Sequence, residues 1–273
     1  MAVLMLCGVS TRLAVPSSLD DLVRDPPSAE WRLPKRLKEI SALAMSDSHR
    51  LFAVDDEIAI IYEIDYDNGK LLKAFAFGEP ALRGDFEGLA LVGDRFYLLT
   101  SDGVLYDAKE GSDGAHVSYN RIDTGLGRQC EFEGLSEDVT PGALLLACKA
   151  LRKRADIDVL SIFRWPLGID RSSESERIDL PIEQITEVLG TPRLRPSGIA
   201  VHPHRDTLVL VAARERALIE LDANGRVLSA LVLPEKNRHP QAEGIEFASN
   251  GSLILADEGQ RGRATMVIYS PPE

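Results

Sequence analysis

Short apolar segments separated by polar turns fill most of this chain, and their alternation is typical of β-strands. In the stretch over residues 39–77, the segments ISALAMS, RLFAVDD, AIIYEID and LLKAFAF follow one another with Asp, Gly and Asn between them. Alternating β-branched and aromatic positions bounded by turn residues indicate strands joined by hairpins. A similar succession of four strands starts near residues 87 and 197. The pattern predicts an all-β protein.

A six-residue motif recurs five times and sets the period of the strands. Its copies read EISALA, DFEGLA, EFEGLS, RPSGIA and QAEGIE, and we call their third residues the marker residues: Ser41, Glu87, Glu133, Ser197 and Glu243. The markers are spaced 46, 46, 64 and 46 residues apart. Four strands in each repeat of about 40–50 residues are typical of propeller blades. We therefore predict a five-bladed β-propeller of four-stranded blades; a β-sandwich, the alternative, does not account for the regular period.

The repeat also predicts how the chain is divided. Residues 31–273 are expected to form one propeller domain, with inner strands starting near residues 41, 87, 133, 197 and 243. The fifth unit has only three strands, so we expect Trp31–Leu37 to supply its outer strand and close the ring, which removes open sheet edges. Residues 1–30 are expected to be a leader, mostly irregular or a short helix. The long third spacing contains Ile182–Gly190, whose apolar spacing and terminal Gly predict a helix.

Propeller topology brings the marker residues and the ends of the second strands to one mouth of the central channel. The acidic residues expected there, and predicted as metal ligands, are Glu87, Glu133, Glu243, Asp56, Glu57, Asp102, Asp257 and Glu258. Crowded carboxylates raise one another's pKa unless a cation intervenes. Oxygen donors without convergent His or Cys favour Ca²⁺. Two other interpretations stay open, because such acids also cap turns or accept hydrogen bonds from backbone amides.

Basic residues are expected at the same mouth, where Lys149 and Arg214 end second strands. This anion-binding rim would suit a small anionic ligand, although Arg and Lys also belong in ordinary solvated loops. No catalytic residue is identified with certainty, and His239, just before the fifth motif, is the candidate acid or base. Ser41 and Ser197 do not lie in a Gly-x-Ser-x-Gly elbow, so we interpret them as small residues at a crowded channel.

Charge and composition limit the binding partners and locations that are expected for this protein. The chain has 31 Lys+Arg against 43 Asp+Glu, a formal net charge of −12, which argues against a general nucleic-acid binder. No apolar run is long enough to span a bilayer. A bridge between Cys130 and Cys148 is left open. The apolar stretch Ala2–Val9 lacks a basic n-region, so localisation is open between the cell envelope and the cytoplasm.

Five segments carry a family resemblance, over residues 37–271: EISALAMS with RLFAVDDE, DFEGLALVGDRFYLLTSDGVLY, EFEGLS, PSGIAVHP and QAEGIEFASNGSLILADEG. They resemble the SdiA-regulated, YjiK-type β-propeller family of bacteria, which implies distant kinship with phytase-like and esterase-like propellers. The resemblance implies a calcium-associated propeller of the cell envelope, linked to calcium homeostasis. It also implies metal-face roles for Glu87, Glu133, Glu243 and the Asp-Glu pairs at 56–57 and 257–258. Ser41 and Ser197 depart from the Glu of the other units, and the aspartate-rich phytase motif has no counterpart.

Two classes of function follow. The first is a calcium-binding propeller of the cell envelope that acts as a sensor or scaffold, without an enzymatic nucleophile. The alternative is a metal-dependent hydrolase of a phosphate ester, ester or lactone, in which a carboxylate or His239 would move protons. A protein-interaction scaffold without metal is a third hypothesis, since fold alone decides little about function in propellers.

Overall fold

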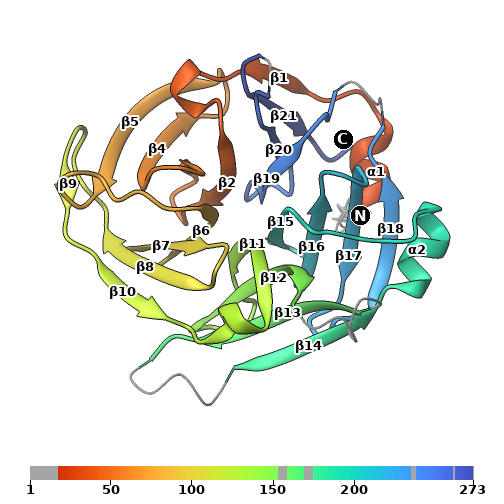
Figure 1. The fold of residues 1–273 in the computed structure, drawn as a ribbon. Coiled ribbons are helices and arrows are strands. Elements are labelled where there is room, and N and C mark those ends of the chain that lie inside the picture. Colours follow the sequence, from red (N-terminus) through yellow and green to blue (C-terminus); the bar gives the residue numbers. More distant parts are fainter. Residues whose placement is uncertain (1–17, 153–158, 169–174, 235–237, 261, 273) are drawn as a thin grey trace, which may run out of the picture.

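The chain forms five β-sheets arranged as blades around a central channel (Figure 1). The structure is a computed structural model, and it describes residues 18–152, 159–168, 175–234, 238–260 and 262–272. Within each blade four antiparallel strands lie side by side outward from the channel. The five-bladed propeller predicted from the repeat is confirmed.

The blades are built from the following strands. Blade 1 holds β2 (Ile40–Met45), β3 (Leu51–Asp55), β4 (Ile60–Asp65) and β5 (Lys70–Phe77). Blade 2 holds β6 (Phe86–Val92), β7 (Arg95–Thr100), β8 (Val104–Lys109) and β10 (Asn120–Asp123). Blade 3 holds β11 (Cys130–Glu137), β12 (Ala143–Leu151), β13 (Val159–Pro166) and β14 (Glu176–Pro181). Blade 4 holds β15 (Gly198–His202), β16 (Thr207–Ala212), β17 (Ala217–Leu221) and β18 (Val227–Val232). Blade 5 holds β19 (Ala242–Phe247), β20 (Leu253–Asp257), β21 (Thr265–Tyr269) and β1 (Ala29–Arg32).

The small elements lie outside the four-stranded pattern. They are α1 (Leu19–Arg24), the 3₁₀ turns η1 (Lys35–Leu37) and η2 (Leu126–Arg128), β9 (His116–Val117) and α2 (Glu183–Leu189). Strand β9 adds to the outer edge of β5 in parallel, which makes blade 1 five-stranded. Helix α2 ends at Gly190 in the left-handed conformation, as the terminal Gly of the predicted helix indicates.

Strand β1 closes the ring by pairing with β21, so both ends of the described chain meet in blade 5 (Figure 1). The predicted position of this strand, Trp31–Leu37, was wrong by a few residues. Pro34 has no N–H to donate to a sheet, and the chain turns into η1 directly after it. The indole N–H of Trp31 donates to the Tyr66 carbonyl over 3.1 Å, which ties the closing strand to blade 1.

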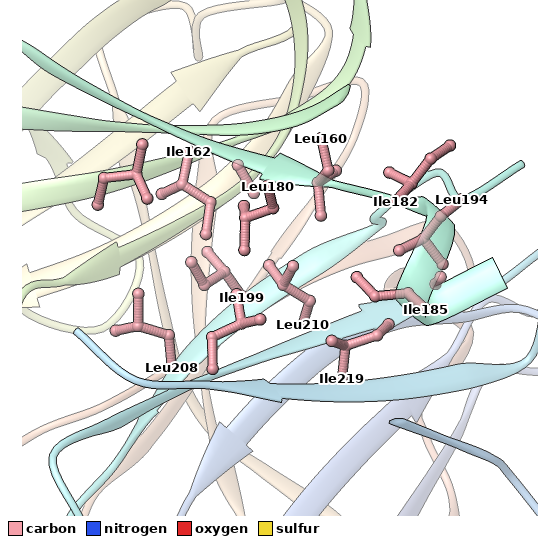
Figure 2. Packing of buried hydrophobic residues seen from close by; sticks show 14 of the residues in the cluster. Leu160, Ile162, Leu180, Ile182, Ile185, Leu194, Ile199, Leu208, Leu210 and Ile219 are labelled. Atoms are coloured by element: carbon pink, nitrogen blue, oxygen red, sulfur yellow. The ribbon is translucent and has the colours of Figure 1, made fainter. Parts of the chain in front are cut away.

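Apolar side chains between adjacent blades make up the core. Figure 2 shows the cluster between blades 3 and 4, where Leu160 and Ile162 of β13 face Ile199 and Leu210 of the next blade. Ile185 of α2 is fully buried at one end of this cluster. Each blade therefore buries one face against each neighbour, as stacked sheets must.

Four marker residues are followed by glycine, and the channel explains why. A Cβ atom placed on Gly198 would lie 2.5 Å from the Glu243 carbonyl oxygen of the neighbouring inner strand. A Cβ atom on Gly88 would lie 2.6 Å from the Cβ atom of Leu135. At Gly88 and Gly198 the inner strands thus approach each other so closely that no side chain fits between them.

This close approach leads to a prediction about stability. Gly198→Ala should lower the free energy of unfolding by about 2 kcal/mol, because the added methyl group meets backbone that cannot move aside without shifting a blade. The matched control is Gly168→Ala, since nothing lies within 4 Å of a Cβ atom at that position. Urea unfolding of both variants measures the difference, and equal stabilities would contradict the explanation.

Candidate functional site at the channel mouth

The marker residues are placed by irregularities in the inner strands. In blades 1, 2 and 5 the pairing with the second strand skips one residue, and the skipped residues are Ser41, Glu87 and Glu243. In blade 3 the register also shifts around Glu133. A β-bulge leaves its extra residue unpaired and redirects its side chain. The bulges therefore free the marker side chains from the sheets at the point where the five inner strands converge.

Two of the three marker glutamates lie in one acidic cluster, which also contains Glu39, Asp56 and Glu258. Burial raises the pKa of Glu87 to about 8, and the nearby charges of Asp85 and Glu243 add to the effect. Burial likewise raises the pKa of Glu243 to about 7, with Asp56 and Glu39 contributing further repulsion. These carboxyl groups are half-buried and close enough to perturb one another.

The remaining members of the acidic cluster come from the strand ends. Burial, followed by the charge of Asp55, raises the pKa of Asp56 to about 6. Burial and a hydrogen bond with the Glu39 carboxyl raise the pKa of Glu258 to about 7. The Gln241 side-chain amide links two members of the cluster, because it donates to Glu243 over 2.8 Å and also to Glu258. The sequence analysis thus predicted Asp56, Glu87, Glu243 and Glu258 in one place, and the structure brings them together.

The third marker glutamate has a cation of its own. The Lys149 ammonium group donates to the Glu133 carboxylate and lies 3.3 Å from a carboxylate oxygen of Glu131. The positive charge of Lys149 also counteracts the rise in pKa at Glu87 and Glu243. Lys149, predicted as part of the anion-binding rim, therefore acts in this structure as an internal counter-ion of the mouth.

Three of the predicted acidic ligands have partners outside the cluster. Glu57 is 72% exposed and faces Arg83 at 3.9 Å, and Asp102 is exposed and accepts a 2.5 Å hydrogen bond from Thr100. Asp257 is buried. Its carboxylate accepts from the Gln241 backbone N–H over 3.1 Å and hydrogen-bonds to His239.

His239 lies inside blade 5 and is 1% exposed. Its Nδ1 is 2.8 Å from Asp257 Oδ2, and its Nε2 is 2.8 Å from the hydroxyl oxygen of Tyr269. A general acid or base must reach the proton that it moves. With both ring nitrogens engaged below the surface, His239 is placed to hold Asp257 and β21 together.

The described residues do not form a ready-made metal centre. Within them, no group of three or more His, Cys, Asp or Glu side chains has an arrangement that could hold a metal ion. The oxygen donors of the acidic cluster match Ca²⁺ in chemical type, but their positions are not those of a preformed coordination shell. Calcium binding stays a prediction.

A cavity of about 530 Å³ opens beside the acidic cluster, and cationic side chains line its other side. Its charged lining residues are Glu133, Lys149, Arg195, Arg214 and Glu243. Within the described part of the chain, the guanidinium groups of Arg195 and Arg214 make no ion pair and no hydrogen bond. Their positive charges lower the pKa of Glu215, against the effect of its burial, and the Glu215 carboxylate accepts from the Arg195 backbone N–H. The mouth is thus acidic on one side and basic on the other.

Ser197 and Ser41 differ although they occupy the same place in the repeat. The Ser197 hydroxyl donates to the Ala242 carbonyl over 2.8 Å and accepts from the Ala213 N–H over 3.0 Å, so it joins blade 4 to blade 5. The Ser41 hydroxyl is buried with no hydrogen-bond partner among the described residues. Neither has the setting of an activated nucleophile, which needs an adjacent base.

The sequence analysis did not single out Glu39, Arg195 and Gln241 as site residues, although Arg195 is one of the basic residues expected on that face. All three stand two positions before a marker, as do Asp85 and Glu131. Residues two apart on a strand share a face. A polar residue two positions before the marker in every repeat therefore indicates a second ring of polar side chains around the channel mouth.

The pH dependence of stability tests the acidic cluster. The pKa of Glu87 is raised above its ordinary value of 4.5. The contribution of this group to the free energy of unfolding is therefore fully present below about pH 4.5 and is lost as the pH rises toward 8. Glu87→Gln mimics the protonated form and should raise the free energy of unfolding by on the order of 2 kcal/mol at pH 9, with little change at pH 4.5. Thermal unfolding at both values measures this, with the exposed Glu57→Gln as control; no gain at pH 9 would contradict the burial of Glu87.

Comparison with solved structures shows that this fold occurs in several enzymes. The glutaminyl cyclase of Myxococcus xanthus is 14% identical, with a TM-score of 0.57 and coverage of 90% of this chain and 97% of that one. The PQQ-bound aldose sugar dehydrogenase of Streptomyces coelicolor is 12% identical, with a TM-score of 0.55 and coverage of 90% and 99%. A luciferin-regenerating enzyme is 10% identical, with a TM-score of 0.51 and coverage of 85% and 93%. At such identities the likeness concerns the fold alone.

The sequence comparison is more specific. Comparison with curated proteins gives no match. Residues 180–270, which include blade 4 and the blade 5 strands β19, β20 and β21, match the model of the SdiA-regulated family. This match agrees with the five-bladed fold, and residues 180–270 of this β-propeller are similar to the SdiA-regulated family.

Proposed function

We propose that this chain is a binding propeller whose channel mouth takes Ca²⁺ at the acidic cluster, and that it acts as a sensor or scaffold of the bacterial cell envelope. One observation carries the proposal. Four carboxyl groups from blades 1, 2 and 5 are held so close together and so poorly solvated that their pKa values rise to between about 6 and 8. Burial is the main cause of this rise and repulsion between the carboxylates adds to it, and a divalent cation would offset both by stabilising the charged forms.

Calcium is the cation that this donor set favours. The cluster offers carboxylate oxygens and the Gln241 amide, and no imidazole or thiolate. Hard oxygen ligands suit Ca²⁺, which accepts six to eight of them in a flexible geometry that includes water. Glu87, Glu243 and Asp56 would hold the ion, while Glu133 stays with Lys149.

The compartment is part of the proposal. Cys130 and Cys148 form a disulfide between β11 and β12, so the pairing that the sequence left open is present. Disulfides persist in oxidising environments such as the bacterial periplasm and are rare in the cytosol. The bridge therefore supports a cell-envelope location. In the described part of the chain, no helix has the length and apolarity needed to cross a bilayer.

One observation favours the alternative, a metal-dependent hydrolase of a phosphate ester, ester or lactone. Glu87 and Glu243, with pKa values of about 8 and 7, both retain protons near neutral pH. The Glu243 side chain lines the open cavity. A carboxyl group with a pKa near the working pH is suited to general acid catalysis. If the native protein hydrolyses such substrates and the Glu243→Gln variant does not, the hydrolase proposal holds and the sensor proposal is wrong.

Calcium titration of chelator-treated protein tests the proposal. We expect saturable heat by calorimetry, and we expect Glu87→Gln combined with Glu243→Gln to abolish it, because the substitutions remove the two carboxyl groups that would lose their protons to hold the cation. Glu137→Gln is the matched control: it replaces a glutamate whose pKa burial also raises, but which lines a separate cavity with Glu246 and Phe247. Absence of heat with folded native protein, or full heat with the double variant, would contradict the proposal.

A further inference from the structure

A second cavity adjoins the channel mouth between blades 3 and 4. Its volume is about 290 Å³, and it lies between β12, β13 and the segment that leads into β15. Lys149 and Arg195 line both this cavity and the 530 Å³ cavity of the mouth. The two cavities therefore adjoin at these two residues, so a ligand group bound at Arg195 would lie beside both.

The described lining of the second cavity is positively charged, whereas the protein as a whole is negatively charged. The chain carries a net charge of −12, yet among the described residues that line this cavity three are cationic and none is acidic. The cations are Lys149, Arg193 and Arg195. Since the Lys149 ammonium group is engaged by Glu133, the Arg195 guanidinium group is the cation placed to receive an anion where the cavities meet.

Apolar residues provide the rest of the described lining. They are Leu151, Val159, Leu160 and Leu194, with Cys148, Ala150 and Pro192. Leu160 and Leu194 also belong to the buried cluster between blades 3 and 4, so packing holds them in place (Figure 2). A cavity lined by apolar residues and by cations, with no acidic residue among those described, suits a ligand that joins an anionic head to a hydrocarbon part.

We propose that the mouth binds an anionic amphiphile, a carboxylate that carries a linear apolar chain, with its head at Arg195 and its chain in the cavity between blades 3 and 4. The inference rests on the proposed function only in taking the channel mouth as the binding site. It deepens that function by naming a ligand class, and it does not depend on Ca²⁺. A methylene group is about the size of a water molecule, which occupies about 30 Å³, so the cavity holds a chain of fewer than about ten carbons.

A series of linear carboxylates from butyrate to dodecanoate, titrated by calorimetry at constant ionic strength, tests the inference. Each buried methylene should tighten binding about three- to fourfold, until the chain fills the cavity and the affinity levels off. Arg195→Gln should weaken binding of every member by a similar factor and leave the dependence on length unchanged, because it removes only the contact with the head.

A second variant acts on the chain alone. Ala150→Leu should flatten the dependence on chain length and leave butyrate binding within about twofold, because the larger side chain occupies the cavity. Ala81→Leu is the control, a half-buried alanine that lines a different cavity, and it should bind the whole series as native protein does. Melting temperatures show whether each variant is folded.

The outcomes separate the two proposals. Binding with no dependence on chain length would overturn the amphiphile and leave the mouth as a site for small anions. No binding of any carboxylate by folded native protein would overturn it as well, and the calcium titration then decides the proposed function by itself. An unchanged length dependence in a folded Ala150→Leu variant would show that the chain lies elsewhere, which also overturns the inference.

Discussion

Close approach of five inner strands around a narrow channel is the constraint on which the rest of this structure depends. Where the strands converge, a Cβ atom at Gly88 or Gly198 would collide with the neighbouring blade. A carboxylate cannot lie between the strands at that level, so the markers Glu87 and Glu243 are set off by bulges at the rim. The same packing that builds the propeller thus gathers acidic side chains at one mouth.

The consequence is electrostatic. Partial burial disfavours the charged form of each carboxyl group, and proximity makes the ionisation of one oppose that of the next. Lys149 is paired with Glu133, and its charge only partly offsets the rise in pKa at Glu87 and Glu243, which make no ion pair of their own among the described side chains. Across the mouth, Arg195 and Arg214 provide positive charge next to open volume. A site divided in this way can attract a cation and an anion to adjacent positions.

The fold was predictable because the period of 46 residues and the motif with its glycine report the blade and the channel directly. The acidic cluster was predictable in part, because topology alone brings Glu87, Glu243, Asp56 and Glu258 to one mouth. The role of His239 was not, since its partners Asp257 and Tyr269 lie 18 and 30 residues away and only packing brings them into contact. The pairing of Glu133 with Lys149 depends on side-chain positions that no spacing specifies.

The central claim is that convergence of the blades holds Glu87 and Glu243 in a poorly solvated, mutually repelling cluster. Carbon-detected NMR titration of the glutamate carboxyl groups in chelator-treated protein, assigned with Glu87→Gln and Glu243→Gln, measures this directly. The account predicts a pKa of about 8 for Glu87 and about 7 for Glu243. Values near 4.5 for both groups in the folded protein would contradict it.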